Sequence, residues 1–368
     1  MSPSQPEHRG PAGARRSTNR IVRCARLGEQ SAAVAGGNAA GGFQHRQTLQ
    51  QPIHQPSSSR CAGATPFAPL YTPSRNGNVL PTQCWSSAMS APGELDPYAV
   101  PDDLAARIDA LDLRRNIVEL IDEGYTVIRD PKAIAIADEV REAIIRCVPA
   151  KPEAKAPTRF TLLDQEPVFA TAVTTPKLLA LVEFLLGRGA LFSQLSGSRR
   201  RPGPQALGLH ADNSWFPAPF PEWEIMCTGC FVTDEFTEES GATLVIPGTH
   251  KLKDHPPKMT RENLEGAVPI VAPKGSICLW NGSVWHGNYP RQLPGERVVL
   301  HMTYTRLGMQ PIETYDHLDD AWFEGKDPSL PRLLGRHNFL GRRHGWKQND
   351  RELLKKTYDD VHGPSFRV

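Results

Sequence analysis

Apolar side chains recur at helical spacing in several segments between residues 101 and 186. The last segment is the clearest, because Leu178, Leu181 and Leu185 fall on one side of a helix. Gly124 and Gly187 follow two of the segments, and glycine commonly ends a helix. The pattern predicts helices over residues 101–109, 113–123, 132–147 and 177–186, with a short strand over 125–128.

The pattern changes at residue 190. From there to residue 306, short β-branched and apolar runs alternate with Gly and Pro, as expected of an all-β barrel or sandwich. The strand that begins at Arg297 should place Arg297, His301 and Thr303 on one face, which is polar enough to line a pocket. Its other face is apolar and is expected to pack against helices. After residue 306 the sequence is turn-rich and predicts no firm structure.

Residues 1–88 differ in composition from the rest. They contain nine Arg, no Lys and only two acidic residues, with no apolar periodicity. Such a segment buries too little apolar surface to offset its ordering entropy, so we expect a disordered extension. It could be a transit peptide, or untranslated sequence before a start at Met89. We expect the folded domain to span residues 89–368.

Charge and cysteine content narrow the class of protein. Without the nine Arg and two acids of residues 1–88, the chain's 42 basic and 40 acidic residues leave a mildly acidic remainder, which predicts no nucleic-acid partner. No apolar run reaches the length that spans a bilayer, so no membrane partner is expected.

Alternation along a strand over 225–233 puts Cys227 and Cys230 on opposite faces, which argues against a shared metal. Free thiols and a cytoplasmic location are expected.

One stretch carries candidate chemistry. In Leu207-Gly-Leu-His-Ala-Asp-Asn-Ser-Trp215, His210 and Asp212 stand two residues apart, and on a strand they would point to the same face. His286, which follows a strand-like run at 276–280, could supply a third ligand. Two His and one carboxylate on one side of an iron leave three positions open, as in non-haem Fe(II) oxygenases. A lone His-x-Asp is weak evidence, since each of these residues alone is more often structural.

The combined motifs strengthen the hypothesis. Asp234-Glu-Phe-Thr-Glu-Glu-Ser-Gly-Ala-Thr-Leu-Val-Ile-Pro-Gly-Thr-His250 follows the His-Ala-Asp stretch, and Arg297 stands eleven residues after His286. Together these motifs resemble the phytanoyl-CoA dioxygenase family over roughly residues 116–306. The resemblance implies a double-stranded β-helix (jelly-roll or cupin-like) core at about 190–306 with flanking helices. It also implies Fe(II) bound by His210, Asp212 and His286.

The resemblance further implies how the cosubstrate is held. Arg297 would bind the distal carboxylate of 2-oxoglutarate, since its planar fork contacts both oxygens. Gln194 and Asn288 are further candidate cosubstrate contacts by their positions relative to the motifs. His250 is expected to belong to a structural turn. Because Asp212 is present, where halogenating relatives have a small residue, hydroxylation is the expected reaction.

The sequence therefore predicts an Fe(II)- and 2-oxoglutarate-dependent dioxygenase that uses O₂, hydroxylates a small or medium-sized organic substrate, and releases succinate and CO₂. Ascorbate is the expected reductant in vitro. Two alternatives remain open. One is a cupin-like metal-dependent isomerase or epimerase, which has no need of Arg297; the other is a metal-binding member without turnover. The sequence predicts neither the substrate nor the oligomeric state.

Overall fold

The structure is a computed structural model that describes residues 100–150, 156–204, 207–257, 264–340 and 351–362. All of these residues belong to one unit of the chain, Leu80–Val368. The predictions for residues 1–88, and for a start at Met89, lie outside the described residues.

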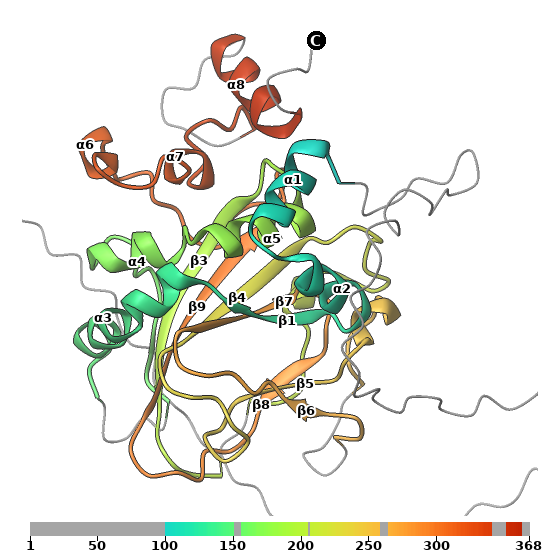
Figure 1. Ribbon diagram of the computed structural model, residues 1–368, viewed down its shortest axis with the longest axis vertical. Helices are drawn as coiled ribbons and strands as arrows, with labels where there is room; N and C mark the ends of the chain where they lie inside the picture. The colour runs from blue at the N-terminus through green and yellow to red at the C-terminus, as the bar shows by residue number, and fades with distance from the viewer. Residues whose placement is uncertain (1–99, 151–155, 205–206, 258–263, 341–350, 363–368) are drawn as a thin grey trace, which may run out of the picture. The chain divides into compact units, whose positions relative to one another are not determined.

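Two antiparallel sheets form the centre of this unit. The larger has the strand order β1-β7-β4-β9-β3-β2 and the smaller the order β6-β5-β8. Figure 1 shows the helices of residues 102–186 beside the larger sheet and the smaller sheet away from them. In the described part of the chain the strands are β1 (Tyr125–Arg129), β2 (Thr158–Arg159), β3 (Leu191–Arg200), β4 (Met226–Val232), β5 (Thr243–Val245), β6 (Val268–Pro269), β7 (Ser276–Asn281), β8 (His286–Asn288) and β9 (Arg297–Thr305).

The chain winds between the two sheets. It leaves the larger sheet after β3, pairs with β8 at His210, and returns to the larger sheet as β4. It then forms β5 and β6 in the smaller sheet, β7 in the larger, β8 in the smaller and β9 in the larger. This alternation is the winding of a double-stranded β-helix, a jelly roll of two packed sheets, and confirms the predicted fold.

The four helices that the apolar pattern predicted are present. Asp130 caps the amino end of α3, because its carboxylate accepts hydrogen bonds from the backbone of Lys132 at 2.8 Å and of Lys177 at 3.0 Å. One carboxylate therefore ties α3 to the start of α5. The helices are α1 (Asp102–Ala110), α2 (Arg114–Asp122), α3 (Pro131–Cys147), α4 (Pro167–Ala172), α5 (Pro176–Leu186), α6 (Asp320–Phe323), α7 (Leu330–Leu333) and α8 (Arg351–His362), with short 3₁₀ helices η1 (Asp212–Trp215) and η2 (Thr249–Leu252).

The two faces of the larger sheet bury different apolar clusters. Leu300, Met302 and Tyr304 of β9 pack with residues of the helices, as the alternation predicted. Val299, the residue before Leu300 on β9, lies on the opposite face of the strand. It packs between the sheets with side chains of β4, β5 and β7. Cys227 lies in the helix-side cluster and Cys230 in the inner one, so the Cys-x-x-Cys pair is split between the faces, as expected.

Several features differ from the sequence expectations, among them α4 and β2, which were not predicted. β1 pairs with β7 along the edge of the larger sheet, so the sheet extends beyond the predicted core at 190–306. The turn-rich region after residue 306 contains α6, α7 and the twelve-residue α8, which were not predicted. Finally, only His210 of the His-x-Asp motif pairs as a strand, because Asp212 begins η1. Asn213 and Ser214 follow it, and both residue types favour turns over strands.

Candidate metal centre and anion site

The structure brings His210, Asp212 and His286 together. One ligand atom from each lies within 4.8 Å of the others. The Oδ1 atom of Asp212 is 3.7 Å from Nε2 of His210 and 3.5 Å from Nε2 of His286. The backbones of the two histidines exchange hydrogen bonds of 2.9 and 2.8 Å, which sets their rings side by side with centroids 4.3 Å apart. A single pair of opposed residues on neighbouring strands therefore positions both imidazoles.

The other ring nitrogens are held by the backbone. Nδ1 of His210 is 2.9 Å from the carbonyl oxygen of Gly208, and Nδ1 of His286 is 3.1 Å from that of Val284. A carbonyl only accepts, so both Nδ1 atoms carry the proton and donate. In the neutral imidazole this leaves the lone pair on Nε2, the nitrogen that faces Asp212, and this is the tautomer that binds a metal through Nε2.

The Asp212 carboxylate is held on its other oxygen. Oδ2 accepts hydrogen bonds from Oγ1 of Thr228 at 2.8 Å and from Nε1 of Trp280 at 3.0 Å, while Oδ1 faces the imidazoles. Burial raises the pKa of Asp212, but His286, His210 and these two donors outweigh it, so the pKa is lowered overall. Burial is also the main cause of the lowered pKa of His286. The carboxylate is thus anionic and the imidazole neutral, as metal ligands must be.

Thr228 and Trp280 were not assigned to the site from the sequence. They lie on β4 and β7 and are directly opposed in the sheet, so the strand register brings both donors to one carboxylate oxygen. The indole ring of Trp280 also contacts the His286 ring, with centroids 4.9 Å apart and the ring planes tilted by 47°. The motif Trp280-Asn-Gly-Ser-Val-Trp-His286 contains this tryptophan, but its role depends on a pairing that no local pattern encodes.

Arg297 is a buried cation at the start of β9. Only 4% of it is exposed. One guanidinium nitrogen, Nη1, donates to the carbonyl oxygen of Gly241, the guanidinium lies 5.0 Å from the centre of the Phe236 ring, and Nε has no partner among the described residues. Burial, then repulsion from Arg200, lowers the pKa of Arg297 to about 10, so it remains charged at neutral pH. No described carboxylate forms an ion pair with it.

The remaining predicted residues occupy different environments. Gln194 pairs with Thr303 across β3 and β9, on the face of β9 that carries Arg297. The Asn288 carboxamide already has protein partners: it accepts from the Leu207 backbone at 3.1 Å and donates to the Tyr289 carbonyl at 3.1 Å. A contact of either residue with a cosubstrate therefore stays a prediction. For Asn288 the structure shows a second role, which is to tie β8 to the segment before His210.

Two other histidines, His250 and His301, do not belong to the candidate metal cluster. His250 is 1% exposed, donates from Nε2 to the Ile121 carbonyl at 3.0 Å, and packs so close to Gly124 that a Cβ there would meet its Nδ1 at 2.5 Å. Its position in η2 after a sharp turn agrees with the structural part expected for it. His301 shares the inner face of β9 with Arg297, and burial followed by repulsion from Arg297 lowers its pKa to about 4.

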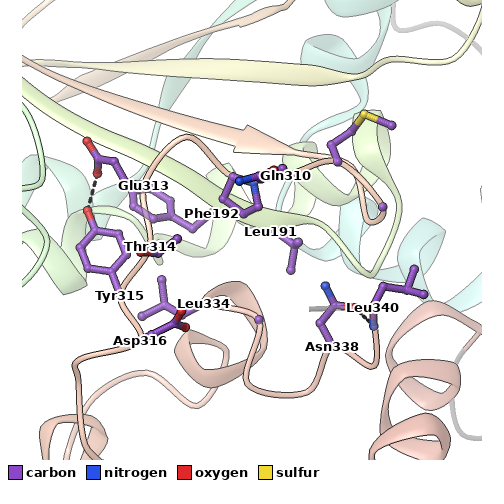
Figure 2. Close-up of a pocket in the computed structure, with 14 residues that line it drawn as sticks. Leu191, Phe192, Gln310, Glu313, Thr314, Tyr315, Asp316, Leu334, Asn338 and Leu340 are labelled. Carbon is purple, nitrogen blue, oxygen red and sulfur yellow. Dashed lines mark hydrogen bonds between the residues drawn. The ribbon is translucent and has the colours of Figure 1, made fainter. Parts of the chain in front are cut away.

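A separate cavity of about 450 Å³ is lined by the first residues of β3 and by residues that follow β9 (Figure 2). Its lining includes Leu191, Phe192 and Tyr315, and none of the predicted site residues. The one buried carboxylate there, Glu313, accepts from the Tyr315 hydroxyl and from the backbones of Leu195 and Thr161. Its oxygens are satisfied, so this cavity offers no comparable chemistry.

Comparison with known proteins agrees with the resemblance read from the sequence. Residues 122–297 match the phytanoyl-CoA dioxygenase (PhyH) family. Dioxygenase af480 of Aspergillus fumigatus is 30% identical over 185 residues, which cover 48% of this chain and 57% of that protein. Dioxygenase trt7 of Aspergillus terreus is 29% identical over 172 residues, covering 45% and 57%. The chain thus matches somewhat more than half the length of these relatives.

Solved structures are similar at lower identity. EctD from S. alaskensis with bound Fe is 19% identical, with a TM-score of 0.47 over 59% of this chain and 85% of that one. HygX from Streptomyces hygroscopicus with nickel and 2-oxoglutarate bound is 15% identical, with a TM-score of 0.45 over 58% and 94%. Within the described ranges of the present chain, no helix has the length and apolar character needed to cross a bilayer.

Proposed function

We propose that this protein is an Fe(II)- and 2-oxoglutarate-dependent dioxygenase that hydroxylates a small or medium-sized organic substrate. The observation that carries the proposal is the convergence of the two histidine Nε2 atoms on Oδ1 of Asp212. Two imidazole nitrogens and one carboxylate oxygen are the donor set of non-haem Fe(II) oxygenases, and the three sides left open suit a chelating cosubstrate and O₂. We assign His210, Asp212 and His286 as the iron ligands.

Iron held there would supply the site for O₂ activation, coupled to the oxidative decarboxylation of 2-oxoglutarate to succinate and CO₂. One oxygen atom of O₂ enters succinate and the other enters the substrate as a hydroxyl group, so the reaction balances. The chain's own residues bind and orient the reactants. Thr228 and Trp280 keep Oδ2 of Asp212 engaged, which leaves Oδ1 for the metal.

Arg297 supports the assignment of the cosubstrate. The Arg297 guanidinium is buried and has no carboxylate partner among the described residues. Burial of an unpaired charge destabilises the folded state unless an anion binds to it. The distal carboxylate of 2-oxoglutarate is such an anion, and it would pair with the nitrogens of Arg297 that the carbonyl of Gly241 does not use. Gln194 and Asn288 remain weaker candidates for cosubstrate contacts.

Exposed apolar side chains flank the iron-binding segment. Leu207 and Trp215, three residues before His210 and three after Asp212, are 53% and 75% exposed. They favour a substrate that presents apolar surface to the iron. The four cysteines of the described ranges, Cys147, Cys227, Cys230 and Cys278, are free thiols, which favours a reducing compartment, and we place the protein in the cytoplasm.

The direct test of function is succinate formation. Purified protein is supplied with Fe(II), ascorbate, O₂ and 2-oxoglutarate, and candidate substrates are screened for added succinate release and for a product heavier by one oxygen. A cupin-like isomerase would convert its substrate without consuming 2-oxoglutarate. A metal-binding member without turnover would bind iron and release no succinate with any substrate. Either result would contradict the proposed reaction.

A further inference from the structure

One buried carboxylate outside the candidate metal cluster joins two loops of the chain. Glu224, two residues before β4, is 3% exposed, and burial raises its pKa although Lys253 opposes that effect. Its Oε1 lies 3.3 Å from Nζ of Lys253, whose side chain is 13% exposed. Lys253 follows η2 with a φ of 52°, a left-handed conformation that non-glycine residues rarely adopt. The pair therefore ties the start of β4 to the end of η2.

The same carboxylate is connected to the turn that leads to His286. The Ser283 hydroxyl lies close enough to Glu224 to oppose the rise in its pKa that burial causes. Oγ of Ser283 accepts a hydrogen bond of 2.8 Å from Nδ2 of Asn213, which leaves the hydroxyl hydrogen free to donate to Glu224. Asn213 follows Asp212 directly, and Ser283 stands three residues before His286. A chain of donors thus links both ligand-bearing segments to Glu224.

The two ligand-bearing segments are packed directly against each other at this point. The backbone N–H of Asn213 donates to the Gly282 carbonyl at 2.9 Å, and the N–H of Gly282 donates to the Met226 carbonyl at 2.8 Å. A Cβ at Gly282 would lie 2.5 Å from Oδ1 of Asn213, so any larger residue there would push the segments apart. Single hydrogen bonds therefore join η1, the turn after β7 and the start of β4.

Stability alone explains this polar network poorly. A buried ion pair loses hydration that its attraction only partly offsets, so its replacement by apolar residues of similar size is often neutral or stabilising. Oδ1 of Asn213 is buried without a hydrogen-bond partner in the described chain, which also destabilises the fold. What the network does achieve is to hold the residue after Asp212 against the turn before His286. These two ligands lie 3.5 Å apart, from Oδ1 to Nε2.

We propose that Glu224 is a positioning residue for the iron site, which acts through Ser283 and Asn213 on the separation of Asp212 and His286. This inference rests on the proposed function. Glu224 anchors the Ser283 hydroxyl, and Ser283 holds the carboxamide of Asn213. The backbone of η1, which begins at Asp212, is thereby fixed relative to the turn that leads to His286. The groups around a metal ligand set its orientation and so its affinity for the metal.

Double variants separate the hydrogen-bond acceptor from the ion pair. Lys253→Met removes the cation in both of them, so that no unpaired buried charge is left. Glu224→Gln/Lys253→Met keeps a side-chain oxygen that can accept from Ser283, whereas Glu224→Leu/Lys253→Met removes it. Ser283→Ala breaks the same chain in its middle. Glu313→Gln, at a buried carboxylate that lines the separate cavity, is the matched control.

Each protein is titrated with Fe(II) under anaerobic conditions, and its melting temperature and the visible charge-transfer absorbance formed on adding 2-oxoglutarate are recorded. Glu224→Leu/Lys253→Met and Ser283→Ala should bind Fe(II) about tenfold more weakly, the lower end of the loss typical for an outer-shell partner. Their absorbance band should shift, because the ligands are placed differently. Glu224→Gln/Lys253→Met should bind Fe(II) within about threefold of wild type, well under one decade. Glu313→Gln should keep affinity and band position even if its melting temperature falls.

Wild-type iron affinity and an unshifted band in Glu224→Leu/Lys253→Met would show that Glu224 positions nothing at the iron site. Equal weakening in the two double variants would assign the effect to the ion pair and overturn the role given to the acceptor. Ser283→Ala decides the question if either double variant does not fold, since wild-type affinity there would rule out the proposed path. If the wild type bound no Fe(II), the proposed function itself would fail, independently of Glu224.

Discussion

Thr228 donates a hydrogen bond of 2.8 Å from Oγ1 to Oδ2 of Asp212. The two residues are sixteen positions apart, and the bond crosses from the larger sheet to the start of η1. It turns one carboxylate oxygen toward the sheet and leaves the other for the two imidazoles. The orientation of the predicted anionic ligand thus depends on a residue that binds no metal itself.

Removing this bond should weaken iron binding. Replacing Thr228 with Val keeps the shape and deletes the donor, so Oδ2 of Asp212 retains only Trp280. Loss of such an orienting partner typically costs about 10- to 100-fold in metal affinity. Thr228→Ser, which keeps a hydroxyl group, is the control. An Fe(II) affinity of Thr228→Val within twofold of wild type, with an unchanged melting temperature, would show that the bond does not orient the ligand.

Arg297→Met should weaken 2-oxoglutarate binding without loss of iron. Truncating one partner of a buried charge pair costs about 2–5 kcal/mol. This corresponds to roughly a 30- to 4,000-fold loss of affinity, at about 1.4 kcal/mol per decade. Iron stoichiometry and anaerobic 2-oxoglutarate titration measure the two effects separately. If the affinity stayed within about threefold of wild type, Arg297 would not be the cosubstrate anchor.

His250 should make the fold less stable in acid. Burial, the main cause, lowers the pKa of His250 in the folded state to about 4, below the value of about 6.5 expected when unfolded. Between these values the unfolded chain binds the proton and the folded chain does not. The contribution of His250 to stability is therefore full above about pH 6.5 and is lost as the pH falls toward 4.

The comparison with His250→Gln isolates this contribution. Gln can also donate to the Ile121 carbonyl but does not titrate. Melting temperatures measured from pH 7 to pH 4 should fall more steeply for the wild type than for the variant. Parallel curves would mean that His250 is protonated equally easily in both states.

Much of the fold was predictable from local patterns. Apolar spacing predicted α2, α3 and α5, and period-two alternation predicted which side chains of β9 face the helices. These elements are long enough for their apolar faces to stand out. The four-residue α6 and α7 present no such pattern. The twelve-residue α8 is polar along most of its length and buries only Thr357, so no apolar face marked it either.

The sequence predicted which residues would form the cluster, but not the strand pairings that position them. His210, Asp212 and His286 were identified by motif spacing, but the reason given, that His210 and Asp212 share a strand face, holds only as far as His210. The roles of Thr228 and Trp280 depend on the register of β4 with β7. Pairings between distant strands leave no periodic trace in either strand alone.

Iron stoichiometry tests the central claim most directly. Wild type, Asp212→Ala and His250→Gln are loaded with Fe(II) under anaerobic conditions, and the iron bound per chain is measured after removal of free metal. Asp212→Ala removes the one anionic ligand that we assign, so it should lose most of the bound iron. His250→Gln alters a buried histidine outside the cluster and should bind iron like the wild type. Full iron in Asp212→Ala, or loss of iron in His250→Gln with Asp212 intact, would contradict the assigned metal centre.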